Sequence, residues 1–254
     1  MQTETTAPTG HERPLQGRVA LITGASRGIG RAAALALAEA GAHIIMMART
    51  VGALEEVDDE IKALGGTATI APLDLLDATK VDAVGPSLIQ RWPHLDIFIA
   101  NAAMLGPLSP LGHITSQQWD AVLALNLNAN WRLIRSLDPL LRASASARVV
   151  FITCAAARGD AAYWGPYAVS KAGVEALART YAREVASTPI RVNLLDPGIT
   201  RTGLRGKAYP GEDETALKTP DALAATFVEM AGAAYDAQGT LRRFDDDAGA
   251  RPMI

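Results

Sequence analysis

Short aliphatic runs alternate with longer stretches of helical periodicity from Arg18 onward. Runs of four to eight β-branched and aliphatic residues are typical of strands, whereas apolar residues recurring every three or four positions are typical of helices. Each short run is mostly apolar, which predicts strands that are buried on both faces. The predicted strands are Val19–Thr23, His43–Ala48, Thr67–Leu73, Asp96–Ala100, Ala147–Cys154, Ile190–Leu195 and a less apolar segment near Thr240–Phe244.

Helical patterns fill the gaps between these strands, and several begin with a Ser, Thr or Pro start signal. The segment Gly203–Lys218, rich in Pro, Gly and charge, is predicted to be a loop over a site. Alternating strands and helices predict an α/β fold, with a mostly parallel seven-stranded sheet covered on both faces. The predicted helices are Ile29–Ala40, Val51–Leu64, Ala78–Gln90, Ser116–Leu141, Gly165–Ala186 and Pro220–Ala231.

Length and composition favour one large domain. The chain has 254 residues, of which 49% are hydrophobic and 20% charged, enough to bury a substantial core. We predict a flexible N-terminal tail over residues 1–14 and a single domain over residues 15–254. The tail lacks the apolar core of a signal peptide, and no stretch approaches ~20 apolar residues, so we expect a cytoplasmic protein.

Net charge, cysteine content and histidine spacing argue against several classes of partner and site. The net charge of −3, with Lys and Arg scattered, gives no footprint for nucleic acid or an anionic membrane, so a small-molecule partner is expected. Cys154 is the sole cysteine, so no disulfide can form within the chain. The four histidines lie far apart in the sequence, and we predict no metal site.

A glycine-rich turn, Thr23–Gly30, lies between the first predicted strand and the first predicted helix. Glycine permits a tight turn there and lets the backbone approach a pyrophosphate at the helix N-terminus. The alternative is a turn that needs glycine only for steric reasons. Its position between strand and helix favours a dinucleotide site formed by Gly24, Ser26, Arg27, Gly28, Ile29 and Gly30.

Two arginines indicate which dinucleotide would bind. An acid at the end of the second strand would bind the ribose 2′-hydroxyl of NAD, whereas an arginine accommodates the 2′-phosphate of NADP. The strand ends in Ala48 and Arg49, and Arg27 adds a second positive group, so NADP(H) is predicted. Either arginine alone could instead be a solvated surface residue. Asp74, after the third strand, is a candidate partner of the adenine amino group or, alternatively, a helix cap.

Tyr167 and Lys171 form the most informative chemical pair. They lie one helical turn apart, so both side chains project from one face of the helix. A free tyrosine has a pKa near ~10, and a nearby ammonium favours the phenolate. We therefore expect Lys171 to lower the pKa of Tyr167 and make it a proton donor near neutral pH.

Several ordered motifs together resemble the short-chain dehydrogenase/reductase family over roughly residues 15–231. Thr-Gly-x-x-x-Gly-Ile-Gly begins at Thr23, Asn-Ala at Asn101, Tyr-x-x-x-Lys at Tyr167 and Pro-Gly-Ile-Thr-Arg-Thr at Pro197, with an isolated Asn126. Three further stretches, at 164–167, 197–205 and 217–220, resemble the YciK-like oxidoreductases of that family. The resemblance implies a Rossmann-type domain, NADP(H)-dependent interconversion of a carbonyl and a secondary alcohol by hydride transfer, and a homodimer or homotetramer.

The resemblance also implies a role for each matching residue. Tyr167 would be the acid/base, and Lys171 would lower its pKa and hold the nicotinamide ribose. Asn126 would fix a water that links Lys171 to solvent, although it could instead be satisfied by a neighbouring backbone group. Asn101 would brace the fourth strand beside the cofactor. The nicotinamide carboxamide would face Pro197, Gly198 and Thr202, with Thr200 in the same turn.

The chain departs from the family at Cys154, which stands where the family places a catalytic serine. A thiol is a weaker hydrogen-bond donor than a hydroxyl, so we expect slower chemistry. Thr153 could substitute only if the strand has ended or bulged there, since adjacent strand side chains face opposite ways. Two other hypotheses stay open: a catalytically weakened NADP(H)-binding module with a sensor or scaffold role, and a thiol enzyme, for which no histidine is near Cys154 in sequence.

Overall fold

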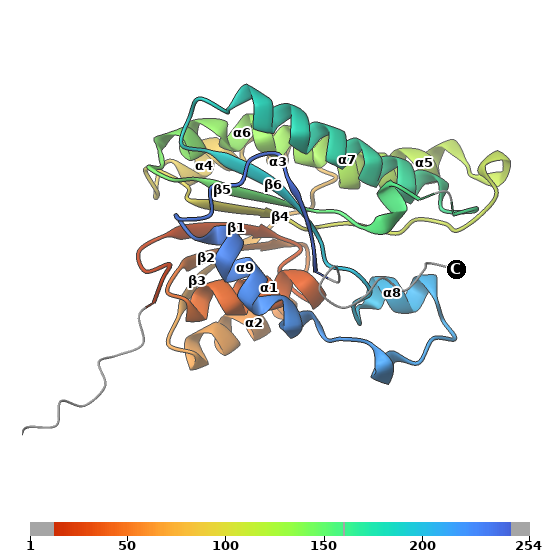
Figure 1. Ribbon diagram of the computed structural model, residues 1–254, viewed down its shortest axis with the longest axis horizontal. Coiled ribbons are helices and arrows are strands. Elements are labelled where there is room, and N and C mark those ends of the chain that lie inside the picture. Colours follow the sequence, from red (N-terminus) through yellow and green to blue (C-terminus); the bar gives the residue numbers. More distant parts are fainter. Residues whose placement is uncertain (1–12, 160, 245–254) are drawn as a thin grey trace, which may run out of the picture.

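The computed structural model of the protein describes residues 13–159 and 161–244 (Figure 1). The predicted tail therefore lies, apart from Arg13 and Pro14, outside the described residues. In the described part, seven strands form one sheet in the order β3-β2-β1-β4-β5-β6-β7, and every neighbouring pair is parallel. The predicted α/β fold is thus confirmed. The strands are β1 (Val19–Thr23), β2 (His43–Ala48), β3 (Thr67–Pro72), β4 (Ile97–Ala100), β5 (Arg148–Ile152), β6 (Arg191–Asp196) and β7 (Leu241–Arg243).

Helices cover both faces of this sheet, as the doubly wound fold requires. Figure 1 shows α1, α2 and α9 below the sheet, and α3, α4, α6 and α7 above it. The helices are α1 (Gly28–Glu39), α2 (Val51–Ala63), α3 (Ala78–Asp82), α4 (Val84–Leu88), α5 (Ser116–Leu123), α6 (Ala129–Ala143), α7 (Gly165–Glu184), α8 (Gly203–Ala208) and α9 (Ala224–Ala231).

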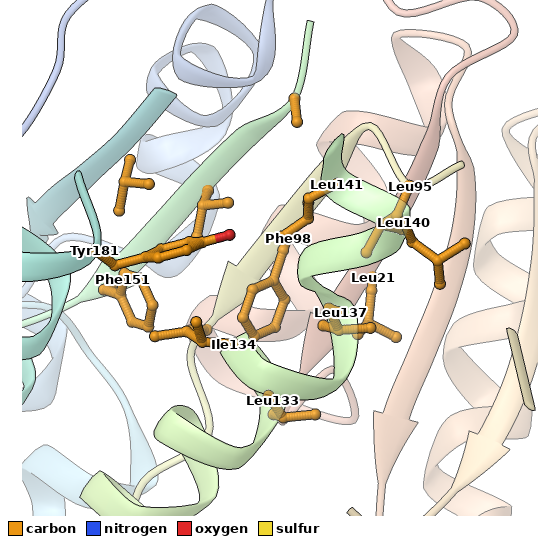
Figure 2. Close-up of a cluster of buried hydrophobic side chains, with 14 of the residues drawn as sticks. Leu21, Leu95, Phe98, Leu133, Ile134, Leu137, Leu140, Leu141, Phe151 and Tyr181 are labelled. Carbon is orange, nitrogen blue, oxygen red and sulfur yellow. The ribbon is translucent and has the colours of Figure 1, made fainter. Parts of the chain in front are cut away.

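Two hydrophobic clusters, one on each face, hold the layers together. Leu21 and Ile22 are adjacent on β1 but belong to different clusters, because neighbouring strand side chains point to opposite faces. Figure 2 shows the upper cluster, in which Phe98 and Phe151 from the sheet meet the leucines of α6. The two phenylalanine rings are 6.1 Å apart and nearly perpendicular, the edge-to-face arrangement that aromatic rings prefer.

The strand order reverses at β1, which has β2 on one side and β4 on the other. The chain leaves β1 for a helix on one face and reaches β4 from the opposite face, so the carboxyl ends of these two strands form the switch point of the sheet. The space outside these two strand ends is referred to below as the crevice. Ligands of open α/β sheets bind at such a switch point. The glycine turn follows β1, and Asn101 follows β4 directly, so both lie at this crevice.

The structure differs from the sequence-based elements in several places. The edge strands β3 and β7 are partly exposed rather than buried on both faces, because each has a neighbour on one side only. The predicted helix Ala78–Gln90 is two short helices that meet at Ala83, near Pro86, which has no N–H to continue a hydrogen-bond ladder. The predicted loop Gly203–Lys218 contains α8, and the predicted helix Ser116–Leu141 contains a π-helical segment at Ala124–Asn128.

Candidate active site

The glycine turn is shaped by close backbone contacts. A Cβ atom on Gly30 would lie 2.2 Å from the carbonyl oxygen of Gly24, and one on Gly24 would lie 2.9 Å from Nδ2 of Asn101. Gly24 and Gly28 also have positive φ angles, of 67° and 56°, which favour glycine. A side chain is therefore excluded by contact at Gly24 and Gly30 and disfavoured by the backbone angle at Gly28, so the turn presents its backbone at these three positions.

The N-terminus of α1 is suited to an anion. Its N-cap, Arg27, makes no side-chain capping hydrogen bond, and its first turn contains no acidic residue. The first N–H groups of a helix lack intrahelical partners and carry the positive end of the helix dipole. Space above Gly28 is open, since a Cβ atom there would meet only Thr202, at 3.7 Å. The turn therefore fits a pyrophosphate.

Arg27 and Arg49 both lie exposed at the surface. Arg49 follows β2, whose end is joined to the glycine turn by a 2.7 Å hydrogen bond from Gly24 N to Met47 O. Asp74 is exposed as well, and its Oδ1 accepts a hydrogen bond from Leu76 N within its own turn. Asp77, not Asp74, caps the next helix, so the capping alternative for Asp74 is wrong.

Asn101 connects β4 to β1 at the crevice. Its side-chain Nδ2 donates to Thr23 O at 2.9 Å and to Gly24 O at 3.3 Å, and its backbone N donates to Thr23 Oγ1 at 3.0 Å. These contacts hold the start of the glycine turn against the end of β4. Asn101 is therefore placed to shape the crevice from within the protein.

Tyr167, Lys171 and Cys154 come together where β5 ends beside the first turns of α7. Sγ of Cys154 donates a long hydrogen bond of 3.8 Å to Oη of Tyr167. Lys171 is buried, donates from Nζ to Ile152 O at 2.8 Å, and lies 5.8 Å from the centre of the Tyr167 ring. The structure thus brings the predicted acid/base, its cationic neighbour and the thiol to one place.

The proton affinities of this group differ from the sequence-based expectation. Burial raises the pKa of Tyr167 well above its ordinary value of 10, and the interactions with the neighbouring Cys154 and with Asp196 raise it further. Burial lowers the pKa of Lys171 below 10.5, against the raising influence of Cys154 and Asp196. The pKa of Tyr167 is therefore raised in this structure, not lowered as expected, because loss of water around the phenol favours its neutral form.

Asn126 lies in the π-helical segment between α5 and α6, where its side chain is fully engaged. Its Oδ1 accepts from Met104 N at 2.9 Å, and its Nδ2 donates to Met104 O at 2.9 Å and Ser170 Oγ at 3.0 Å. The alternative that a neighbouring backbone group satisfies the Asn126 side chain therefore describes this structure. Single π turns often mark functional sites, and this one ties α7 to the segment after β4.

Thr153 does not replace the missing serine. The strand ends at Ile152, but Oγ1 of Thr153 donates to Oε1 of Glu175 at 2.9 Å in the interior. Its hydroxyl is buried and is hydrogen-bonded to the carboxylate of Glu175. Cys154 is the residue that meets Tyr167.

The turn after β6 lies across the crevice. Gly198 has a φ of 64° and donates its N–H to Oδ1 of Asp196 at 3.0 Å. Thr200 is buried and donates to Pro197 O at 3.1 Å, so its hydroxyl stabilises the turn itself. Thr202 accepts from Arg205 N at 3.1 Å and so caps α8.

The start of α8 joins the two ends of the crevice. Thr202 lies above Gly28 of the glycine turn, whereas Leu204, two residues later, packs in the small cluster that contains Tyr167. Trp164 belongs to the same cluster, with its ring centre 5.9 Å from that of Tyr167 and 5.8 Å from that of Tyr209. The glycine turn and Tyr167 thus lie at the same end of the sheet, linked by the start of α8, and the side chains that pack beside Tyr167 are aromatic and apolar.

Sequence reasoning missed a buried group of charges behind the site. Arg158 contacts both Glu175 and Asp196, which are buried. Glu175 lies eight residues after Tyr167 and four after Lys171, a spacing that puts all three on one face of α7. That spacing was the available signal for Glu175, but its arginine partner depends on the tertiary fold.

Comparison with known proteins agrees with this fold. Residues 18–213 match the model of the short chain dehydrogenase family. The chain is 35% identical to a protein of Escherichia coli K12 named "Uncharacterized oxidoreductase YciK", over 94% of this chain and 96% of that protein. In the part of the chain that the structure describes, no helix is long and apolar enough to cross a membrane.

Two solved structures with bound nucleotide have the same fold. A short chain dehydrogenase from Escherichia coli CFT073, complexed with NADPH, superposes with a TM-score of 0.87 and is 33% identical, covering 92% of this chain and 99% of that chain. One from Shigella flexneri 2a strain 301, complexed with NADP, gives the same TM-score of 0.87, identity of 33% and coverages of 92% and 99%.

Proposed function

The chain belongs to the short chain dehydrogenase family of oxidoreductases, and we propose that it uses NADP(H) to interconvert a carbonyl group and a secondary alcohol. The meeting of Tyr167, Lys171 and Cys154 beside a crevice lined by the glycine turn carries this proposal. The glycine turn fits a pyrophosphate, and the exposed Arg27 and Arg49 fit a ribose 2′-phosphate. The NADPH and NADP complexes of the two similar proteins support the choice of cofactor.

The protein's own residues would handle the proton. When bound, the nicotinamide cofactor would supply the hydride chemistry at the carbonyl or alcohol carbon. Tyr167 donates its Oη proton to the carbonyl oxygen during reduction and takes a proton from the hydroxyl during oxidation. Cys154 donates a hydrogen bond from its thiol to the same oxygen, and the buried Lys171 places a positive charge near the phenol.

The remaining predicted residues would bind and orient. Gly24, Ser26, Gly28, Ile29 and Gly30 present the glycine turn to the pyrophosphate. Oδ1 of Asp74 accepts from Leu76 N, and no described residue donates to its Oδ2, which would accept from the adenine amino group. Asn101, Asn126 and Thr200 hold the walls of the crevice through contacts within the protein. Pro197, Gly198 and Thr202 would face the nicotinamide from the turn after β6.

Calorimetric titration with NADPH and NADH tests the cofactor proposal, and we expect tighter binding of NADPH. The reaction is tested by following NADPH oxidation with a panel of ketones, aldehydes and quinones, using Tyr167→Phe as the matched control. We expect turnover by the parent protein and its loss in Tyr167→Phe, with NADPH affinity retained. If neither the parent nor Cys154→Ser oxidises NADPH with any member of the panel, the reductase proposal is wrong.

A second candidate function is an NADP(H)-binding module with weakened catalysis and a sensor or scaffold role. The observation that favours it is the long thiol contact of 3.8 Å at the position of the usual hydroxyl, beside a tyrosine whose pKa is raised. This candidate predicts normal NADPH binding by Tyr167→Phe and no difference from the parent in any functional assay.

We also propose that the chain forms a homodimer or homotetramer through α6 and α7. Trp131 on α6 is 46% exposed and, with Leu177 of α7, lines a shallow surface hollow. Large exposed apolar groups on neighbouring helices are typical of contact surfaces between subunits. Light scattering after size exclusion should give a mass of two or four chains, reduced by Trp131→Glu but not by the exposed Leu111→Glu. A monomeric parent would contradict this.

A further inference from the structure

The charged cluster of Arg158, Glu175 and Asp196 links the segment after β5, α7 and the end of β6. Arg158 contacts Oε1 of Glu175 through Nη1 and Oδ2 of Asp196, at 2.5 Å, through Nη2. Glu175 also accepts from Arg179 Nη2 at 2.8 Å and from Thr153 Oγ1 at 2.9 Å. Both carboxylates are buried, and the Arg158 side chain is 25% exposed. One guanidinium therefore bridges two buried negative charges.

Each carboxylate of the cluster belongs to a segment of the proposed site. Glu175 lies on the face of α7 that carries Tyr167 and Lys171. Asp196 ends β6 and accepts from Gly198 N at 3.0 Å, so it fixes the turn that would face the nicotinamide. Holding both carboxylates fixes the distance between the proton donor and that turn.

The same arginine also acts on the segment that carries the thiol. Thr153, whose hydroxyl is held by Glu175, immediately precedes Cys154, and Arg158 lies four residues after Cys154. A short 3₁₀ turn over Ala155–Ala157 connects Cys154 to Arg158, whose N–H donates to Ala155 O at 3.0 Å. The position of Sγ relative to Oη of Tyr167 therefore depends on the cluster as well.

Charge gives the cluster a second role. The carboxylate of Asp196 raises the pKa of both Tyr167 and Lys171. The charged and titratable groups around the phenol are Cys154 after β5, Lys171 and Glu175 on α7, Asp196 on β6, and Arg158 beside the last two. Arg179 lies farther out, with a side chain that is 45% exposed. Arg158 is the cation in contact with Asp196, so it offsets the field of that carboxylate at the phenol.

We propose that Arg158 is a positioning residue for the reaction, which aligns α7, the Cys154 segment and the turn at Gly198 and neutralises Asp196 beside Tyr167. This inference rests on the proposed oxidoreductase function. It assigns to Arg158 an action through Asp196 and Glu175, with no contact to the reactants. A misplacement of ~1 Å at reacting groups can cost ~100-fold in rate, so alignment of this kind has a measurable effect.

Three variants separate alignment from charge. Arg158→Met removes the charge and both contacts. Arg158→Lys keeps the charge, but its single ammonium group cannot contact Glu175 and Asp196 in the way that the two Nη atoms of arginine do. Arg179→Met is the matched control, because it removes an arginine from the same Glu175 but does not touch Asp196. Adding Asp196→Asn to Arg158→Met removes the uncompensated carboxylate and provides a rescue of the charge effect.

The kinetic readout is the pH profile of kcat for alcohol oxidation. In Arg158→Met we expect kcat to fall at least ~10-fold and its rise with pH to move to higher pH, because an uncompensated Asp196 makes Tyr167 hold its proton more tightly. Arg158→Lys should keep the parental pH profile with a reduced kcat. Asp196→Asn in the Arg158→Met protein should return the profile toward that of the parent. Arg179→Met should match the parent in both respects.

Two activity-free readouts decide the inference even if no substrate turns over. NADPH affinity, measured by calorimetry, reports the position of the turn at Gly198. The rate at which iodoacetamide alkylates Cys154, the sole cysteine, reports the position of the segment that carries the thiol. We expect Arg158→Met to weaken NADPH binding and change the alkylation rate severalfold, and Arg179→Met to change neither. The inference is overturned if Arg158→Met and Arg158→Lys, both folded by circular dichroism, equal Arg179→Met in affinity, alkylation rate and pH profile. If Arg158→Met does not fold, Arg158→Lys decides alone.

Discussion

The sulfur of Cys154 lies 3.8 Å from the hydroxyl oxygen of Tyr167, and this contact joins the segment after β5 to α7. A hydroxyl is a stronger donor than a thiol, and its oxygen approaches a partner to about 2.7 Å. Replacing sulfur by oxygen at this position therefore strengthens the hydrogen bond available to a substrate oxygen while leaving the cofactor-binding turn untouched.

Cys154→Ser should accordingly raise kcat for carbonyl reduction about 10-fold to 100-fold, since one hydrogen-bond donor to a developing oxyanion is worth about that much or more. Steady-state NADPH oxidation measures the effect, and calorimetry should give an unchanged NADPH affinity. Cys154→Ala is the control and should be no faster than the parent. A serine variant that is as slow as the alanine variant would show that the thiol does not limit the rate.

Arg49 is expected to discriminate NADPH from NADH. Because hydrogen bonds to charged groups contribute about 1.5–3 kcal/mol, Arg49→Ala should weaken NADPH binding about 10-fold to 100-fold and leave NADH binding nearly unchanged. Arg183→Ala, an exposed arginine in the last turn of α7, is the control and should alter neither affinity. Equal losses for both nucleotides would place Arg49 away from the 2′-phosphate.

Gly30 and Gly52 offer a matched pair of glycine-to-alanine changes. A Cβ atom on Gly30 would lie 2.2 Å from Gly24 O, whereas one on Gly52 in α2 would meet nothing within 4 Å. We expect Gly30→Ala to destabilise the protein by about 1–3 kcal/mol and to weaken NADPH binding, because the turn must open. Gly52→Ala should be neutral or stabilise by at most about 1 kcal/mol. Urea unfolding measures both, and equal stabilities would contradict the tight turn.

The upper core should be sensitive to cavities. Leu137 on α6 is fully buried beside Phe98, as Figure 2 shows, whereas Leu111 is 66% exposed. Leu137→Ala should therefore lower the free energy of unfolding by about 2–5 kcal/mol. Leu111→Ala should change it by no more than about 0.5 kcal/mol. A small effect at Leu137 would mean that α6 relaxes to fill the space.

The order of strands and helices followed from local pattern, but the breaks within helices did not. The strands β1 and β2 end where the runs of aliphatic residues end, since their side chains face a core on both sides. The helix α8 has six residues and two glycines, so periodicity could not identify it, although Thr202 is a recognisable cap. The π-helical turn at Asn126 depends on contacts with Met104 and Ser170 from other elements.

Site residues divide in the same way. Tyr167 and Lys171 were predictable because helical spacing alone brings them together. Arg158 was not, since its partners Glu175 and Asp196 lie 17 and 38 residues away in the sequence. Local spacing also could not anticipate the raised pKa of Tyr167, which reflects how completely the fold excludes water from the phenol.

The pKa of Tyr167 determines which direction of the reaction depends on pH. Burial first, and then the interactions with Cys154 and Asp196, raise it above 10, so the phenol keeps its proton at neutral pH. Carbonyl reduction needs that proton, and its kcat should be nearly constant between about pH 6 and pH 9. Alcohol oxidation needs the phenolate, whose fraction rises about tenfold per pH unit below the pKa, so its kcat should rise steeply across that range.

Stopped-flow measurement of hydride transfer in both directions, rather than of steady-state turnover alone, separates this effect from slow release of product. Replacing the buried Lys171 by Met should slow oxidation further at every pH, because the phenolate loses the positive charge 5.8 Å from its ring. A different outcome would be a rate of alcohol oxidation that levels off near neutral pH in the parent but not in Lys171→Met. That result would mean that the ammonium of Lys171 lowers the pKa of Tyr167 in the working complex. The effect of burial seen here would then be reversed when cofactor and substrate bind.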